Sequence, residues 1–215
     1  MKTLFFSLLV LLTACTAKER DTQNLPWKTS ITESGATQVF GIAVGEVTLK
    51  ELSIRLKKIS DSALFETPKC VLSLEAYFGK TMIGLLEGRI IVDLEAGSAF
   101  LKTERQYARD RDSTPNNNWK YKLSTEGLAQ TVDMIIWRMV YIPTGEYEQK
   151  QIRFFGKPEE IIKVTETAQY RLYPSKGVAL LWDIEGSEIF YYVAPKDFLR
   201  LKASLPMEIV RPKED

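Results

Sequence analysis

The fold class is set by the stretch VALLWDIEGSEIFYYV, residues 178–193. Its two apolar runs are rich in β-branched and aromatic residues, and Glu185-Gly186 between them is typical of a two-residue hairpin turn. With that turn, the predicted cross-strand pairs are Trp182 with Ile189, Leu180 with Tyr191 and Val178 with Val193. A similar composition at residues 160–164 and 167–173 extends the hairpin, so the last third of the chain predicts an antiparallel meander.

A helix is predicted directly before this meander. It starts at Thr144 and ends at Phe155, with Gly156 in the C-cap position and Pro158 beyond it. The helix and the strands that follow it form one unit of the predicted fold.

The segment before that helix is harder to classify. Residues 119–123 predict a strand and residues 124–130 a short helix. Residues 132–142 fit either a helical stripe or a strand. Their β-branched and aromatic content and the stop at Pro143 favour a strand.

The first half of the chain shows the same order of elements. Thr48 and Glu51 form a capping box at the start of a predicted helix over residues 49–59. The apolar face of this helix consists of Leu49, Leu52, Leu56 and Ile59. Strands are predicted at residues 63–66, 71–78 and 82–94, broken by Pro68, Gly79 and Gly88, and a further helix at residues 98–109.

These elements predict an α+β fold with two helix-then-antiparallel-meander halves, as a tandem repeat packed as one unit would give. The stretch from Asp110 to Asn118 has no apolar residue and is the expected boundary between the halves. The expected divisions are a signal peptide at residues 1–14, a lipidated flexible tether at 15–30, an N-terminal half at 31–110, a polar linker at 111–118, a C-terminal half at 119–205 and a loose tail at 206–215.

Residues 1–15 predict export and a lipid anchor. Lys2 precedes an apolar run over residues 4–12, which as a helix would extend about 14 Å, less than half of a hydrocarbon core of roughly 30 Å. Leu12-Thr13-Ala14-Cys15 then resembles the lipobox of bacterial lipoproteins, in which the cysteine is acylated. The resemblance implies that Cys15 anchors the chain in the lipid bilayer. The alternative is an ordinary signal peptide with a chance cysteine.

The residue directly after Cys15 indicates which membrane the anchor enters. Thr16 stands there rather than Asp, and by the same resemblance this implies the outer membrane, with the chain facing the periplasm.

Composition excludes several classes of function. The chain has 29 basic and 28 acidic residues, and removal of residues 1–14 takes away only the charge of Lys2. This balance argues against nucleic acid as a partner. The sequence has no histidine, which excludes Ser-His-Asp and Cys-His catalysis and the usual His-containing zinc sites, so we expect no cofactor or metal. With Cys15 acylated, Cys70 cannot form an intramolecular disulfide, and its apolar neighbours predict a buried thiol.

Two groups of side chains are candidates for a functional site. Aromatic rings could line a groove for a peptide, glycan or lipid, although rings at strand spacing are more often core. This group consists of Trp27, Trp119, Trp137, Trp182 and the run Phe190-Tyr191-Tyr192. Glu75, Asp93 and Glu95 lie on neighbouring predicted strands and could converge as the carboxylate pair of a glycan hydrolase. Nothing in the sequence assembles a nucleophile with a base or a phosphate-binding loop, so no catalytic residue is assigned.

Residues 144–195 resemble the small helix-and-meander module of BamE/SmpA-type outer-membrane lipoproteins and of β-lactamase-inhibitor-like domains. The resemblance rests on the helix ending in Phe155-Gly156-Lys157-Pro158, followed by Tyr173-Pro174, a glycine turn and Glu185-Gly186. It transfers no functional residue, and it implies a non-enzymatic protein that presents a sheet face to partners in the envelope.

The leading hypothesis from the sequence is therefore a membrane-anchored envelope lipoprotein that acts as a non-enzymatic binding or assembly module, with an envelope protein as its partner. One alternative is a carboxylate-based cell-wall glycan hydrolase or lytic enzyme. Another is a structural spacer without a small ligand.

Overall fold

The structure, a computed structural model, describes residues 24–147, 149–186 and 188–207. It is an α+β fold with a ten-stranded antiparallel sheet in the order β10-β11-β12-β13-β9-β6-β5-β4-β8-β7 and a three-stranded sheet in the order β1-β2-β3. The strands of the large sheet are β4 (Asp61–Glu66), β5 (Leu72–Ile83), β6 (Leu86–Leu94), β7 (Arg111–Ser113), β8 (Trp119–Lys122), β9 (Ile136–Pro143), β10 (Glu160–Lys163), β11 (Ala168–Tyr173), β12 (Val178–Asp183) and β13 (Ile189–Val193). The small sheet consists of β1 (Ser30–Ile31), β2 (Thr37–Val39) and β3 (Ile42–Val44).

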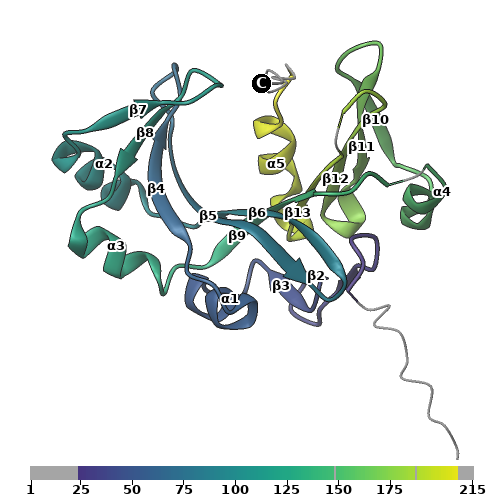
Figure 1. Ribbon diagram of the computed structural model, residues 1–215, viewed down its shortest axis with the longest axis horizontal. Helices are drawn as coiled ribbons and strands as arrows, with labels where there is room; N and C mark the ends of the chain where they lie inside the picture. The colour runs from purple at the N-terminus through teal and green to yellow at the C-terminus, as the bar shows by residue number, and fades with distance from the viewer. Residues whose placement is uncertain (1–23, 148, 187, 208–215) are drawn as a thin grey trace, which may run out of the picture.

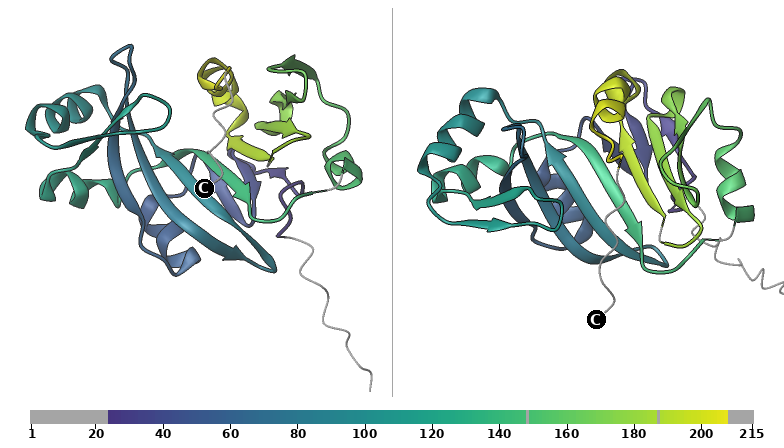
Figure 2. Two further views of the ribbon diagram at one scale, coloured as in Figure 1. Left: turned by 45° about the horizontal axis from the view of Figure 1, so that its top comes forward. Right: turned by 90° about the horizontal axis from the view of Figure 1, so that it is seen from above.

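The large sheet is strongly curved (Figure 1). Strands β4, β7 and β8 rise as one arm, β10 to β12 rise as the other, and β5, β6 and β9 form the floor between them (Figures 1 and 2). The helices are α1 (Leu49–Leu56), α2 (Ser98–Tyr107), α3 (Thr125–Thr131), α4 (Gln149–Ile152) and α5 (Phe198–Ser204), with 3-10 turns at Arg153–Phe155, Pro174–Lys176 and Pro195–Asp197. Helix α5 lies on the concave face of the sheet, whereas α1 and the small sheet lie on the convex face (Figure 1).

Each face of the floor has its own core. On the convex face, α1 and the small sheet pack on side chains such as Phe78, Val92 and Tyr141. On the concave face, Phe198 and Leu201 of α5 pack with strand residues that include Val140, Tyr191 and Val193. The strands at the centre of the sheet are therefore buried on both faces.

The capping box before α1 is confirmed. The Thr48 hydroxyl accepts the N–H of Glu51 at 3.2 Å, and the Glu51 carboxylate accepts the N–H of Thr48 at 2.8 Å. The helix ends at Leu56, earlier than predicted, because Lys57 adopts a left-handed conformation with φ of 52°. Ile59 therefore lies beyond the helix and is exposed rather than part of its apolar face.

The hairpin of residues 178–193 forms, but the predicted register is wrong by one residue. The observed pairs are Val178 with Tyr192, Ala179 with Tyr191, Leu180 with Phe190 and Leu181 with Ile189. The predicted pairs were Val178 with Val193, Leu180 with Tyr191 and Trp182 with Ile189. The Asp183 side chain accepts the N–H of Glu185 at 3.1 Å, and its carbonyl accepts that of Gly186 at 3.4 Å. The observed pairs are centred on Glu185, so the connection between the strands has an odd number of residues, whereas a two-residue turn has an even number.

Two other predicted elements have different bounds. The predicted strand 132–142 is β9, but it starts only at Ile136. The predicted helix from Thr144 to Phe155 is shorter: α4 spans Gln149–Ile152 and continues as a 3-10 turn that ends at Gly156, with φ of 86°. The helix predicted at residues 98–109 is confirmed as α2.

Residues 111–118, predicted as a polar linker, form a β-hairpin with the next strand. Strand β7 pairs with β8 through Arg111 with Tyr121, Asp112 with Lys120 and Ser113 with Trp119. The Thr114 N–H donates to the Asn118 carbonyl at 2.9 Å, and Asn117 takes a positive φ of 59° in the turn. Strand β7 lies at the edge of the sheet, where a strand needs no apolar side chains. Its polar composition therefore gave no sign of a strand in the sequence.

The described chain is already docked at residue 26. The Tyr192 hydroxyl donates to the Pro26 carbonyl at 2.9 Å, and the Trp27 ring packs edge-on against that of Tyr147 at 5.4 Å. Ser30 is the first residue of β1. The part of the expected tether after residue 25 therefore belongs to the folded domain.

Candidate functional site

The concave face of the large sheet carries the sequence-predicted acidic residues. Glu75 on β5 lies directly opposite Asp93 on β6, and Asp93 lies directly opposite Arg138 on β9. Directly opposed residues of an antiparallel pair share a face, so these three charged side chains form a row across the floor.

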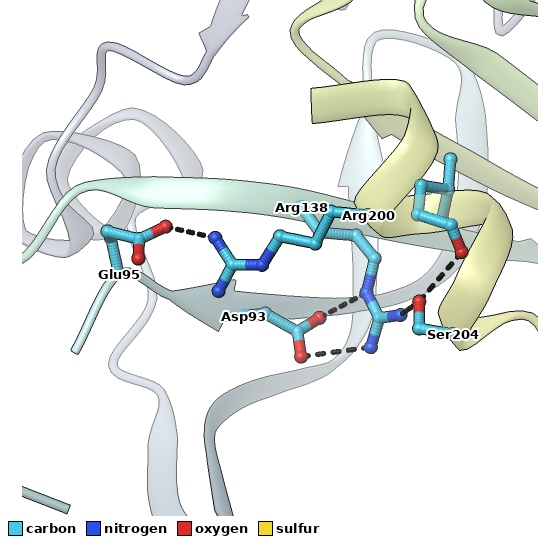
Figure 3. Close-up of polar contacts among 6 residues, drawn as sticks. Asp93, Glu95, Arg138, Arg200 and Ser204 are labelled. Carbon is cyan, nitrogen blue, oxygen red and sulfur yellow. Dashed lines mark hydrogen bonds and ion pairs between the residues drawn. The ribbon is translucent and has the colours of Figure 1, made fainter. Parts of the chain in front are cut away.

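Asp93 and Arg138 form a nearly buried ion pair below α5 (Figure 3). The Asp93 oxygens accept hydrogen bonds from Nε of Arg138 at 2.6 Å and from Nη2 at 2.9 Å. The remaining nitrogen, Nη1, donates to the Ser204 hydroxyl of α5 at 2.9 Å. Only 3% of the Asp93 side chain is exposed. The pair therefore joins β6 and β9 and fixes the end of α5 on the sheet.

Glu95 does not converge with the other two carboxylates. It lies beyond the irregularity in pairing after Asp93 and binds the guanidinium group of Arg200 on α5 (Figure 3). Arg200 in turn covers the ring of Trp137, with its central carbon 3.7 Å from the ring centroid. The Trp137 ring thus packs under the guanidinium group of Arg200.

Glu75 lines a hollow of about 200 Å³ beside this row. The other lining residues come from β4, β5, β6 and β8; they are Asp61, Ala63, Phe65, Tyr77, Ile91 and Lys120. Burial of the carboxyl group and the nearby charge of Asp93 raise the pKa of Glu75 to about 7, against the opposing effects of Arg138 and a hydrogen bond with Ser73. Glu75 therefore titrates near neutral pH.

A larger hollow of about 550 Å³ lies farther along the concave face, between the turn of the β7–β8 hairpin and strands β11, β12 and β13. Its lining residues are Pro115, Asn116, Asn117, Asn118, Tyr170, Leu181, Ile189, Tyr191, Pro206 and Met207. It combines tyrosine rings and aliphatic groups with a row of side-chain amides, which can both donate and accept hydrogen bonds.

Of the aromatic candidates, Tyr191 lines the larger hollow, while Phe190 and Tyr192 belong to the convex core. Trp119 lies under Arg111, and Trp182 lies near Arg171 on β11. Sequence reasoning missed Tyr170 and the asparagine turn. Three consecutive asparagines were the available signal, because this residue type favours turns.

Cys70 corrects a further prediction, since it is exposed rather than buried. It occupies the turn between β4 and β5 with φ of 58°, and its N–H donates to the Thr67 carbonyl at 2.9 Å. A residue in such a turn points away from the sheet despite its apolar neighbours in sequence.

Cys15 lies outside the described residues. Within the described ranges, no three or more Cys, Asp or Glu side chains are grouped so as to hold a metal ion. In the same part of the chain no helix is long and apolar enough to cross a membrane.

Comparison of the chain with protein-family models, curated proteins and solved structures found no match.

Proposed function

We propose that this chain is a lipid-anchored protein of the bacterial cell envelope, held at the outer membrane by acylated Cys15 and facing the periplasm. The lipobox resemblance of Leu12 to Cys15 and the short apolar run before it support this proposal. Metabolic labelling with palmitate, followed by membrane fractionation, tests it. Cys15→Ser is expected to lose both label and membrane association, whereas Cys70→Ser is expected to keep both.

The anchored domain acts as a non-enzymatic binding or assembly module, and its concave face takes the partner. The observation that carries this proposal is the larger hollow, where the rings of Tyr170 on β11 and Tyr191 on β13 line the same space as the amides of Asn116 to Asn118 in the β7–β8 turn. Apolar contact area combined with a few polar groups is the usual make-up of a recognition site. The Asp93–Arg138 pair lends the face rigidity rather than net charge.

The expected partner is another envelope protein. In-cell photo-crosslinking tests this, with the crosslinking side chain at Asn116, which is exposed at the rim of the hollow. The matched control position is Ile54, which is exposed on α1. A specific protein adduct at Asn116 but not at Ile54 is expected, and recovery of barrel-assembly components would support the module resemblance. Equal adducts at both positions would contradict a binding role for the concave face.

The finer description of the fold is also a proposal: the chain is a tandem repeat of helix-then-meander units packed as one. In its favour, α1 precedes β4, β5 and β6, and α4 precedes β10 to β13. The resemblance of residues 144–195 to the BamE/SmpA-type module concerns the second of these units.

A carboxylate-based glycan hydrolase remains the second candidate because of one observation. Glu75 lies in a hollow beside a second carboxylate, and its pKa near 7 suits a general acid. Against it, both oxygens of Asp93 are held by Arg138. Release of soluble sugar from purified peptidoglycan, abolished by Glu75→Gln, would establish this alternative. No release by the unaltered protein would remove it.

A further inference from the structure

The tip of the β5–β6 hairpin leaves large apolar side chains in solvent. Met82 and Leu85 are 58% and 85% exposed, while Ile83 between them is buried and Leu86 packs against the convex core. Ile83 and Leu86 therefore attach the hairpin tip to the core, while most of the Met82 and Leu85 side chains is in solvent. An exposed pair of this kind at a protruding turn indicates contact with an apolar surface.

A second apolar group lies at the start of the described chain. The rings of Trp27 and Phe154 stack with centroids 5.7 Å apart, and Phe154 remains 68% exposed. Lys28 and Arg153, which adjoin these two residues in sequence, are also exposed. Aromatic rings flanked by cations are typical of groups that lie at a membrane interface.

A series of contacts places these two groups along one edge of the molecule. Trp27 packs against Tyr147, and the Tyr147 and Tyr141 hydroxyl oxygens lie 3.4 Å apart. The Tyr141 hydroxyl donates to the Glu87 carbonyl at 3.3 Å, next to the hairpin tip, and Thr144 donates its N–H to the same carbonyl at 3.0 Å. The views agree that the hairpin end lies beside the segment where the described chain begins (Figures 1 and 2).

We infer that this edge, defined by Met82, Leu85, Trp27 and Phe154, rests on the lipid bilayer into which the chain is anchored. The inference rests on the proposed acylation of Cys15. From Cys15 to Asn24 the chain advances nine residues, which even fully extended reach about 30 Å. The edge beside Trp27 is therefore the part of the domain that the anchor keeps within reach of the lipid. Contact there buries apolar surface and brings Lys28 and Arg153 to the phosphate groups.

Depth-dependent quenching tests this contact with the full-length acylated protein in vesicles of phosphatidylethanolamine and phosphatidylglycerol. An environment-sensitive fluorophore is attached at Leu85→Cys or at Phe154→Cys, each in a Cys70→Ser background because Cys70 is exposed. The matched control is Leu199→Cys, a leucine that is 80% exposed and belongs to α5, the helix on the concave side of the sheet (Figure 1). Lipids with brominated acyl chains are expected to quench the label at positions 85 and 154, with a blue shift of emission, and to leave the label at 199 unchanged.

Flotation of the same vesicles separates failure of this inference from failure of the anchor. A protein that floats with the vesicles but whose labels at positions 85 and 154 stay unquenched keeps its anchor and overturns the membrane-contacting edge. Quenching at only one of the two positions overturns the edge as defined. A protein that is not acylated and does not float removes the anchor and the inference together.

Discussion

Replacing Glu75 by glutamine is expected to stabilise the protein above pH 7 and to change its stability little at pH 5. The carboxyl group lines a narrow hollow opposite Asp93, and burial together with that charge raises its pKa to about 7. Glutamine has almost the same shape as the protonated acid and carries no charge, so it removes only the cost of ionisation in this position.

The sign follows from the protons held by each state. Between pH 4.5, the ordinary pKa of a glutamate side chain, and about pH 7, the folded chain keeps a proton on Glu75 that the unfolded chain has lost. Stability contributed by the protonated group is therefore complete below the unfolded pKa and is lost as the pH rises through the folded pKa. At about 1.4 kcal/mol per pKa unit, and with a reduction for partial contact with solvent, the loss between pH 5 and pH 8 is about 2 kcal/mol.

Urea unfolding of both proteins at pH 5 and pH 8 measures this difference. Glu75→Gln is expected to gain about 2 kcal/mol over the unaltered protein at pH 8 relative to pH 5, without a change in the urea dependence. Glu87→Gln removes one exposed charge from the neighbouring strand β6 and serves as the control, with no such pH dependence expected. A stability difference for Glu75→Gln that is the same at both pH values would refute the reasoning.

Three further perturbations test other contacts. Arg138→Met leaves Asp93 buried without its ion-pair partner and is expected to cost about 3–5 kcal/mol in urea unfolding; the Arg138→Lys variant should recover part of this loss. Thr37→Val removes the hydroxyl that donates to the Val193 carbonyl at 2.7 Å and is expected to cost about 1–3 kcal/mol by the same measurement. Cys70 is exposed, so the folded protein should react with a thiol reagent as fast as the urea-unfolded chain, and protection in the folded state would contradict the structure.

The sequence predicted correctly those features of the fold that depend only on residues close together along the chain. The capping box of Thr48 and Glu51 fixed the start of α1, because both partners lie within one helical turn. The end of that helix depended on the left-handed conformation of Lys57, which the residue type does not signal. The register of β12 with β13 differs from the predicted one by one residue, and the Asp183 side chain accepts the N–H of Glu185 within the connection, a contact that the residue types did not signal.

The candidate site was predicted only in part for the same reason. Glu75 and Asp93 were placed on neighbouring strands, and they are indeed cross-strand partners. Their environment comes from Arg138 and Ser204, which lie far along the chain and reach the row only through the order of strands and the position of α5. Pairing of distant strands is not encoded in local composition, so the hollow that the asparagine turn lines together with β11, β12 and β13 could not be foreseen.

Strand β9 shows why the most ambiguous segment became the central one. It pairs with β6 on one side and with β13 on the other, so it joins the strands that precede residue 95 to those that follow residue 159. Met139 and Tyr141 enter the convex core, while Arg138 and Val140 face the side of α5. A strand buried on both faces has no alternation of polar and apolar residues, and a continuous apolar run fits a helix equally well. Residues 132–142 thus lack an alternation of polar and apolar residues because β9 is buried on both faces, between β6 and β13.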